Sequence, residues 1–273
     1  MYLTRTRVRE LLQRHDLAPS RALGQNFLCD GPMIDKIVRL SGVGPGDPVI
    51  EIGPGLGSLT VGLAAAGADV TAIEVDRYLL PALRETVDGQ GAAGSVRIIN
   101  ADVRELAWDE VLDDRPQTVV ANLPYNIATP LILDLLAAEP RLSRWLVMVQ
   151  REAGERLVAG PGSKTYGIPS VLVAYWAEAR IVGSVSAELF LPRPRVESVL
   201  VSIDRAPEPR VDAAFDRLAT LVRAGFGQRR KMLRRSLADL VDPGGFAAAE
   251  VAPTARPEEL GIEDWARLAT VSP

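Results

Sequence analysis

Short apolar runs alternate with helical patterns along the first part of this chain. Five apolar runs have the length of buried strands: 48–52, 69–75, 96–99, 118–121 and 145–149. Five further segments have helical periodicity: 5–13, 32–40, 58–66, 77–86 and 129–136. Because strands that alternate with helices are typical of βαβ units, the pattern predicts an α/β fold on a parallel sheet. Later strands are expected at 179–185 and 198–203.

The pattern changes near residue 206. Ala206-Pro-Glu-Pro-Arg210 is typical of a linker, and the sequence after it is helical, with breaks at Gly244-Gly245, Pro253 and Pro257. We therefore expect two domains, a larger α/β domain over residues 1–205 and a small all-helical domain over residues 206–273.

The composition excludes several classes of protein and several kinds of site. Hydrophobic residues make up 47% and charged residues 24% of its 273 positions, which excludes wholesale disorder. No apolar run approaches about 18 residues and the N-terminus has no apolar signal core, so we expect a cytoplasmic protein without a membrane span. The single Cys29 and the single His15 exclude an internal disulfide and leave no cluster for a metal. Carboxylates, amides, aromatics, backbone and a bound cofactor must supply the chemistry.

The acidic total hides a basic segment. The formal net charge is −4, yet residues 193–235 hold eleven Lys and Arg against five Asp and Glu. On a helix starting at Arg229, positions 230 and 234, and 231 and 235, would lie one turn apart on one side. Such a face is either a solvated helix surface or a phosphate-binding surface, and both interpretations stay open here.

A glycine-rich turn follows the first strand of the expected sheet. Pro48-Val-Ile-Glu-Ile-Gly-Pro-Gly-Leu-Gly57 ends a strand with three glycines, which let a backbone approach a ligand closely. Glu74 ends the next strand and Asp102 follows the third, where Rossmann-type folds hold the ribose and the base. Taken singly, the glycine segment is a tight strand-to-helix turn, and Asp102 is an exposed surface acid. In this order they predict a site for an adenosine-containing ligand, with NAD and S-adenosylmethionine as alternatives.

Asn122-Leu-Pro-Tyr125 directly follows the fourth strand, where the sheet would deliver side chains into the same cleft. Out of context it is a strand-end turn with a buried tyrosine. After a cofactor loop and two strand-end acids, we interpret it as the catalytic end of the site. It resembles the motif of S-adenosylmethionine-dependent methyltransferases that modify exocyclic amino groups.

Further motifs between residues 23 and 236 resemble those of one family. They are Leu23-Gly-Gln-Asn-Phe-Leu28, Glu51-Ile-Gly-Pro-Gly-Leu-Gly57, Asn122-Leu-Pro-Tyr-Asn-Ile127, Gln150-Arg-Glu152, Glu155-Arg-Leu-Val-Ala-Gly-Pro-Gly-Ser-Lys-Thr-Tyr-Gly167, Phe190-Leu-Pro-Arg-Pro-Arg-Val-Glu-Ser198 and Phe226-Gly-Gln-Arg-Arg-Lys-Met-Leu-Arg-Arg-Ser236. In this order they are similar to the ribosomal RNA small-subunit adenine dimethyltransferase A family. Two departures are Gly154 and Pro257, each standing where that family usually has alanine, and Gly154 costs about 1 kcal/mol of helix propensity.

The resemblance implies a Rossmann-like class I S-adenosylmethionine-dependent methyltransferase domain with a small C-terminal helical domain that binds RNA. It also implies N6,N6-dimethylation of two adjacent adenosines in the 3′-terminal hairpin of 16S rRNA. The substrate would be a late assembly intermediate of the small subunit, and the enzyme a monomer without a metal. By motif position, the contacts to S-adenosylmethionine would come from Asn26, Leu28, Glu51, Gly53, Gly55, Glu74, Asp102 and Asn122.

The reaction explains why an amide stands at the catalytic position. The lone pair of an adenine amino nitrogen is delocalised into the ring, so the enzyme has to orient the amine toward the methyl donor. The Asn122 oxygen and the Leu123 carbonyl would each accept one N–H of that amine. Tyr125 and Phe190 would stack on the extruded base, although Phe190 is also interpretable as a core aromatic. The expected phosphate contacts are Arg193, Arg195, Arg229, Arg230, Lys231, Arg234 and Arg235.

Three other functions remain as alternatives. A 23S rRNA adenine N6-methyltransferase of the macrolide-resistance type would share the cofactor motifs, but the runs 155–161 and 226–231 favour the 16S enzyme. A DNA adenine methyltransferase usually carries a separate sequence-reading domain. A binding protein that acts as an assembly checkpoint would not need an intact site, and both Asn122 and Glu74 are present.

Overall fold

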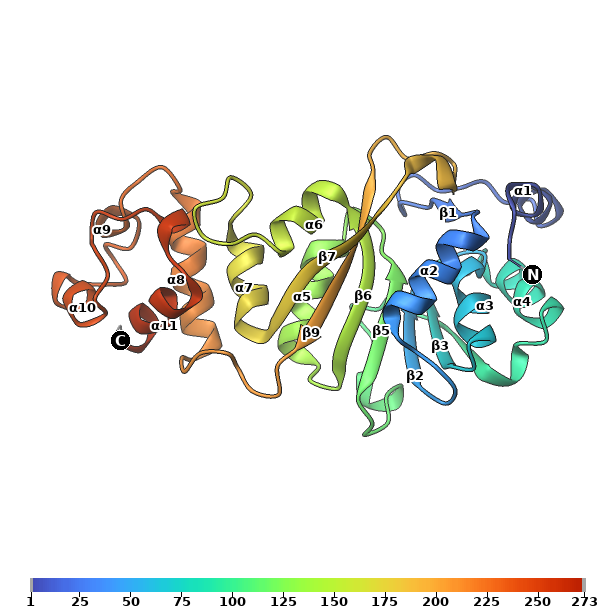
Figure 1. Cartoon of the computed structure of the whole chain (residues 1–273), viewed down its shortest axis with the longest axis horizontal. Coiled ribbons are helices and arrows are strands. Elements are labelled where there is room, and N and C mark those ends of the chain that lie inside the picture. The colour runs from blue at the N-terminus through green and yellow to red at the C-terminus, as the bar shows by residue number, and fades with distance from the viewer. Residues whose placement is uncertain (1, 272–273) are drawn as a thin grey trace. The chain divides into compact units, whose positions relative to one another are not determined.

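The computed structural model describes residues 2–271, which form two compact units (Figure 1). The first unit comprises the chain up to Gly154 together with Arg180–Asp204, and the second comprises Glu155–Ala179 and the chain from Arg205 onward. We expected one change of domain near residue 206, whereas Glu155–Ala179 also belongs with the C-terminal helices. The chain also crosses between the units after Gly154, inside α6 (Arg151–Leu157), and after Ala179, inside β7 (Ala177–Val185). Because both crossings lie within regular secondary structure, no linker-like composition marks them.

A seven-stranded sheet with the order β4-β3-β2-β5-β6-β9-β7 carries the site. The strands β2 to β6 are parallel, as expected, whereas β9 returns antiparallel to β6 with Val201 opposite Val147. The bounds are β2 Pro48–Ile52, β3 Asp69–Glu74, β4 Val96–Asn100, β5 Gln117–Asn122, β6 Leu142–Gln150, β7 Ala177–Val185 and β9 Ser198–Arg205. A separate short ribbon pairs β1 (Phe27–Leu28) with β8 (Phe190–Leu191) in antiparallel fashion.

Helices cover the sheet of the first unit and bury its apolar faces. One cluster packs Ile34 and Ile37 of α2 and Leu63 of α3 against strand residues such as Val49 and Val70. These side chains are at most 2% exposed, and each fully buried aliphatic side chain stabilises the fold by about 1.5–3 kcal/mol. The helices of this unit are α1 Arg5–Arg14, α2 Gly31–Ser41, α3 Ser58–Ala65, α4 Leu80–Gly89 and α5 Ala128–Ala138, with short 3-10 turns at Ala93–Ser95, Trp108–Glu110 and Ala187–Leu189. Helix α6, Arg151–Leu157, begins in this unit and ends in the second.

The second unit is helical and is organised around aromatic side chains. Phe226 lies between Tyr166 and Trp265, with ring centroids 5.9 Å and 6.0 Å apart, and Trp265 is fully buried. The Tyr166 hydroxyl donates to the Leu260 carbonyl at 2.8 Å, which ties the loop before α7 to the C-terminal segment. Its helices are α7 Ile168–Trp176, α8 Phe215–Gly227, α9 Leu233–Ser236, α10 Pro243–Ala248 and α11 Ile262–Val271, with a 3-10 turn at Pro257–Glu259.

Candidate active site

Three glycines shape the turn between β2 and α3. Gly53, Gly55 and Gly57 have φ angles of 72°, 59° and 89°, in the left-handed region that glycine adopts without strain. A Cβ on Gly55 would lie 3.1 Å from the Phe27 ring, and one on Gly57 would lie 2.9 Å from Leu83. Both the backbone angle and the available space therefore require glycine in this turn.

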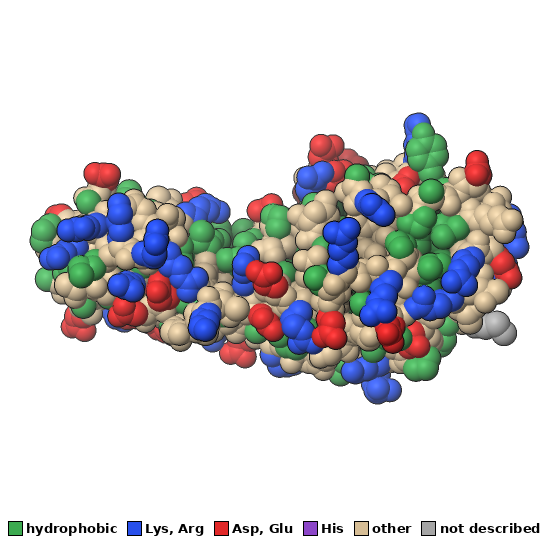
Figure 2. Space-filling view, turned by 90° about the horizontal axis from the view of Figure 1, so that it is seen from above, with side chains coloured by type: hydrophobic (Ala, Val, Ile, Leu, Met, Phe, Trp, Pro, Cys, Tyr) green, Lys and Arg blue, Asp and Glu red, His purple; other side chains and the backbone are tan. Residues whose placement is uncertain are grey.

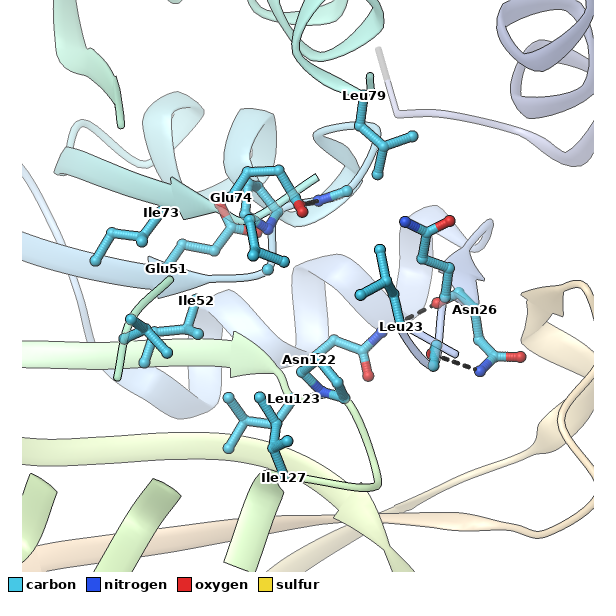
Figure 3. Close-up of a pocket in the computed structure, with 18 of the residues that line it drawn as sticks. Leu23, Asn26, Glu51, Ile52, Ile73, Glu74, Leu79, Asn122, Leu123 and Ile127 are labelled. Atoms are coloured by element: carbon cyan, nitrogen blue, oxygen red, sulfur yellow. Dashed lines mark hydrogen bonds between the residues drawn. The ribbon is translucent and has the colours of Figure 1, made fainter. Parts of the chain in front are cut away.

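The turn borders a cavity of about 320 Å³ at the carboxyl ends of β2, β3 and β5 (Figure 3). The sheet changes its direction of growth between β2 and β5, which is where open α/β sheets bind ligands. Leu123 and Tyr125 also line this cavity, so the cofactor loop and the catalytic motif come together. Every residue expected to contact the cofactor lines it: Asn26, Leu28, Glu51, Gly53, Gly55, Glu74, Asp102 and Asn122.

Glu74 ends β3 with only 4% of its surface exposed. Its Oε2 accepts a hydrogen bond from the Gly55 N–H at 3.0 Å, and its Oε1 accepts one from the Asp76 N–H at 2.9 Å. Burial raises the pKa of Glu74, and these backbone donors act in the opposite direction. The carboxylate is held in one orientation beside the glycine turn, and its remaining lone pairs can accept from ligand hydroxyls.

Asp102 lies on the loop after β4 and pairs with Arg104, two residues further on. Its Oδ1 accepts from the Arg104 backbone N–H and from Nε, both at 3.0 Å, and its Oδ2 accepts from Nη2 at 2.6 Å. These contacts lower the pKa of the Asp102 carboxyl, the guanidinium first among them. Asp102 therefore stays an ionised acceptor at the cavity wall, and Arg104, which the sequence did not single out, lines the same wall.

Glu51 is the most deeply buried acid at the cavity, with 1% of its surface exposed. Burial raises the pKa of Glu51 to about 8; the Thr60 side chain opposes the rise, and the negative charge of Glu74 adds to it. Within residues 2–271, its Oε2 and the Oγ of Ser58, which also lines the cavity, have no hydrogen-bond partner. Because unsatisfied buried oxygens are costly, they indicate a place for a ligand group that donates hydrogen bonds.

Asn122 stands at the end of β5 with its amide oriented by the N-terminal segment. Its Nδ2 donates to the Asn26 backbone carbonyl at 3.1 Å, as Figure 3 shows, so Oδ1 is the atom left to accept from a substrate. The neighbouring Leu123 donates its N–H to the Met148 carbonyl at 3.1 Å. Among residues 2–271 no donor reaches the Leu123 carbonyl. Two adjacent acceptors, one amide and one backbone, are thus available at the catalytic end.

The two expected aromatic residues are placed differently. Tyr125 lines the cavity half-buried, and its hydroxyl lies 2.6 Å from Ser198 Oγ. Burial raises the pKa of Tyr125, so the hydroxyl stays protonated. Phe190 is fully buried in the cluster around Leu28 and Ile34 and does not line the cavity. The expectation that its ring lies open to a base is therefore not met in this arrangement, because the β1–β8 ribbon turns it into the core.

The N-terminal segment contributes more residues than the sequence singled out. Leu23, Gly24 and Gln25 line the cavity beside Asn26. The only available signal was their place in the Leu23–Leu28 motif, since an irregular segment has no periodicity to interpret. The end of the site that faces the substrate is therefore built from residues about 100 positions apart in the chain.

The basic residues fall into two groups. Arg193 and Arg195 are exposed between β8 and β9, and Arg193 lies 3.4 Å from Glu188. The remaining ones belong to the second unit, whose surface carries many Lys and Arg side chains in Figure 2. Arg229 is engaged with Glu258 at 3.5 Å, whereas four are exposed: Arg230, Lys231, Arg234 and Arg235.

The expected continuous helix through this basic run is wrong. Helix α8 ends at Gly227 and α9 begins only at Leu233. The Leu233 N–H donates to the Ala255 carbonyl at 2.8 Å, and Arg229 Nη2 donates to the Lys164 carbonyl at 3.2 Å. These tertiary hydrogen bonds take the backbone out of the helical path, so the one-turn spacing of the cations does not apply.

Among residues 2–271, no helix is long and apolar enough to cross a membrane. The same residues contain no group of three or more His, Cys, Asp or Glu that could hold a metal ion.

Sequence comparison relates almost the whole chain to known proteins. The family model for ribosomal RNA adenine dimethylase matches residues 19–272. The ribosomal RNA small subunit methyltransferase A of Kineococcus radiotolerans is 46% identical over 97% of this chain and 90% of its own length. The protein of the same name from Leifsonia xyli is 46% identical over 96% of this chain and 95% of its own length.

Two solved structures are similar over most of the chain. The 23S rRNA methyltransferase ErmE has a TM-score of 0.70 at 27% identity and covers 90% of this chain and 99% of its own. A dimethyladenosine transferase from Plasmodium falciparum has a TM-score of 0.74 at 22% identity and covers 89% of this chain and 95% of its own. The second likeness concerns the fold alone.

Proposed function

This chain belongs to the ribosomal RNA adenine dimethylase family, and from that premise we propose that it dimethylates N6 of two adjacent adenosines in the 3′-terminal hairpin of 16S rRNA. Its cofactor is S-adenosylmethionine, and the fold is that of a class I methyltransferase. The substrate we propose is a late assembly intermediate of the small subunit, met by a monomer in the cytoplasm.

The cavity fits this cofactor. Glu51 Oε2 and Ser58 Oγ lack donors, and the α-ammonium group of the methionine part would supply them. Glu74 would accept from the ribose hydroxyls, and Asp102 would face the adenine. The glycine turn, with φ between 59° and 89°, leaves room for the methionine end. When bound, S-adenosylmethionine supplies an electrophilic methyl group.

The observation that carries the proposal is the pair of acceptors at Asn122 and Leu123. The amide nitrogen is tied to the Asn26 carbonyl at 3.1 Å, so its oxygen and the Leu123 carbonyl can accept the two N–H groups of an adenine amine. Holding both protons turns the nitrogen lone pair toward the methyl group. A monomethylated amine still offers one N–H to one acceptor, whereas a dimethylated amine offers none. The site therefore suits two transfers and then loses its hold on the product.

Other residues would bring the target base to that point. Tyr125 has an aromatic face at the cavity, worth about 1–3 kcal/mol of stacking on an extruded base. A second face from Phe190 would require the ring to leave its buried position. Arg193 and Arg195 would hold phosphates of the RNA, and so would the exposed cations of the second unit.

The test is transfer of labelled methyl groups from S-adenosylmethionine to small subunits isolated from a strain that lacks this modification. We expect label at two adjacent adenines near the 3′ end of 16S rRNA, and a loss of at least about 100-fold in rate for Asn122→Ala, the effect of removing one aligned hydrogen-bonding group. Denaturant unfolding of the variant, compared with that of the wild type, controls for its folding.

Two results would overturn the proposal. Label on 23S rRNA instead would indicate the activity named for ErmE, whose structure is similar over 90% of this chain. No label on either RNA, with tight binding to the immature particle, would indicate an assembly factor whose catalysis is not used.

A further inference from the structure

Gln25 is the residue that connects the N-terminal segment to the end of β3. Its Nε2 donates to Asp76 Oδ2 at 2.8 Å, and its Oε1 accepts from the Ser20 N–H at 2.8 Å. The Asp76 Oδ1 in turn accepts from the Tyr78 N–H at 3.0 Å. Each hydrogen-bonding group in this chain of contacts has one role, donor or acceptor, and no contact can be reversed alone.

The segment held in this way carries the Asn26 carbonyl. That carbonyl accepts a hydrogen bond from Asn122 Nδ2 at 3.1 Å and so orients the Asn122 amide with its oxygen free to accept from the substrate. Asn26 also donates from its own side chain to the Gly24 carbonyl at 2.9 Å, and Asn126 Nδ2 reaches the Ala22 carbonyl at 3.4 Å. Of these contacts, the one from Gln25 is made to a carboxylate, the stronger class of hydrogen bond.

We propose that Gln25 and Asp76 form a latch that fixes the N-terminal segment across the cofactor cavity and thereby positions the Asn122 amide for methyl transfer. Gln25 is a positioning residue, because it acts through the Asn26 carbonyl. A glutamine is required at this position because one end of the side chain must donate and the other must accept. The inference rests on methyl transfer to an amine as the reaction of this site.

The hydrogen bond of the latch can be reversed by exchanging its donor and its acceptor. This gives a test that does not depend on the loss of a contact alone. Gln25→Glu alone places two carboxylates against each other, and Asp76→Asn alone places two amide NH₂ groups against each other. In the double variant, the amide at position 76 can donate to the carboxylate at position 25. That carboxylate still accepts from the Ser20 N–H, and the amide oxygen at position 76 still accepts from the Tyr78 N–H. All three hydrogen bonds are then restored, and only the one between positions 25 and 76 has the opposite polarity.

The experiment compares wild type, Gln25→Glu, Asp76→Asn and the double variant in two assays. Single-turnover methyl transfer should slow by about tenfold or more in each single variant and return to within about threefold of wild type in the double variant. Hydrogen exchange without cofactor or RNA should show faster exchange of the amides of residues 20–26 in both single variants and restored protection in the double variant. Gln13→Glu, which adds the same charge at an exposed position of α1, serves as the control and should leave both readouts unchanged.

The outcomes separate the latch from the proposed function. Single variants that match wild type in both assays, or a double variant no better than the worse single one, would overturn the latch. A wild type that transfers no methyl group would overturn the proposed function and leave the exchange data to decide the latch as a structural element. Slower methyl transfer in the single variants with unchanged hydrogen exchange of residues 20–26 would also contradict the latch. The substitutions would then not act through the N-terminal segment.

Discussion

Replacing Glu51 by glutamine should stabilise the protein, and should do so more as the pH rises. Glu51 is a fully buried carboxyl whose pKa is raised to about 8 from an ordinary value of 4.5. A carboxyl with a raised folded-state pKa contributes stability that is complete below about pH 4.5 and is lost as the pH rises through 8. At 1.36 kcal/mol for each unit of pKa, the loss is on the order of 5 kcal/mol. Because glutamine does not ionise, Glu51→Gln should not show this loss of stability.

The assay is denaturant unfolding of the cofactor-free protein and of Glu51→Gln between pH 5 and 8.5. The difference in unfolding free energy should be small near pH 5 and should grow in favour of the variant by a few kcal/mol at pH 8.5. Since all other titrating groups are common to both proteins, this difference isolates Glu51. A difference that does not change with pH would refute the reasoning.

The same carboxyl should link cofactor binding to proton release. An ammonium group placed near Glu51 Oε2, which has no partner within residues 2–271, favours the ionised form. Binding of S-adenosylhomocysteine near pH 7 should then release close to one proton, measured by calorimetry in buffers of different ionisation enthalpy. Glu51→Gln should bind more weakly and release none, and equal proton release from both proteins would contradict the assignment.

Two further predictions concern packing and RNA binding. Gly154→Ala gains about 1 kcal/mol of helix propensity, but its Cβ would lie 2.3 Å from the buried Val199 Cγ2. We therefore expect the unfolding free energy to fall by about 1–2 kcal/mol in denaturant unfolding. Unchanged or raised stability would contradict this prediction. Replacing Arg234 and Arg235 together by alanine should lower particle affinity and reduce the slope of log affinity against log salt by roughly 1–2. Arg84→Ala, at an exposed position of α4, is the matched control, and an equal effect there would argue against a specific phosphate surface.

The parallel part of the sheet could be predicted from the sequence alone, as could most of the polar residues that line the cavity. Each strand from β2 to β6 followed from an apolar run, and the glycine turn, Glu74 and Asp102 followed from their places at strand ends. Such features depend on local periodicity and on the rule that parallel strands deliver their carboxyl ends to one edge. Asn122 and its neighbours could be found for the same reason, because Asn122 directly ends β5.

The orientation of those residues depends on tertiary contacts that the sequence pattern does not reveal. The Asn122 amide is turned by a carbonyl 96 positions earlier in the chain, and Phe190 is drawn into the core by a two-residue strand pair. The basic run after Gly227 leaves the helix because Leu233 bonds to Ala255, and α7 joins the C-terminal helices without any linker to mark it. These outcomes depend on hydrogen bonds and packing between segments far apart in sequence, and no local pattern of apolar and polar residues encodes them.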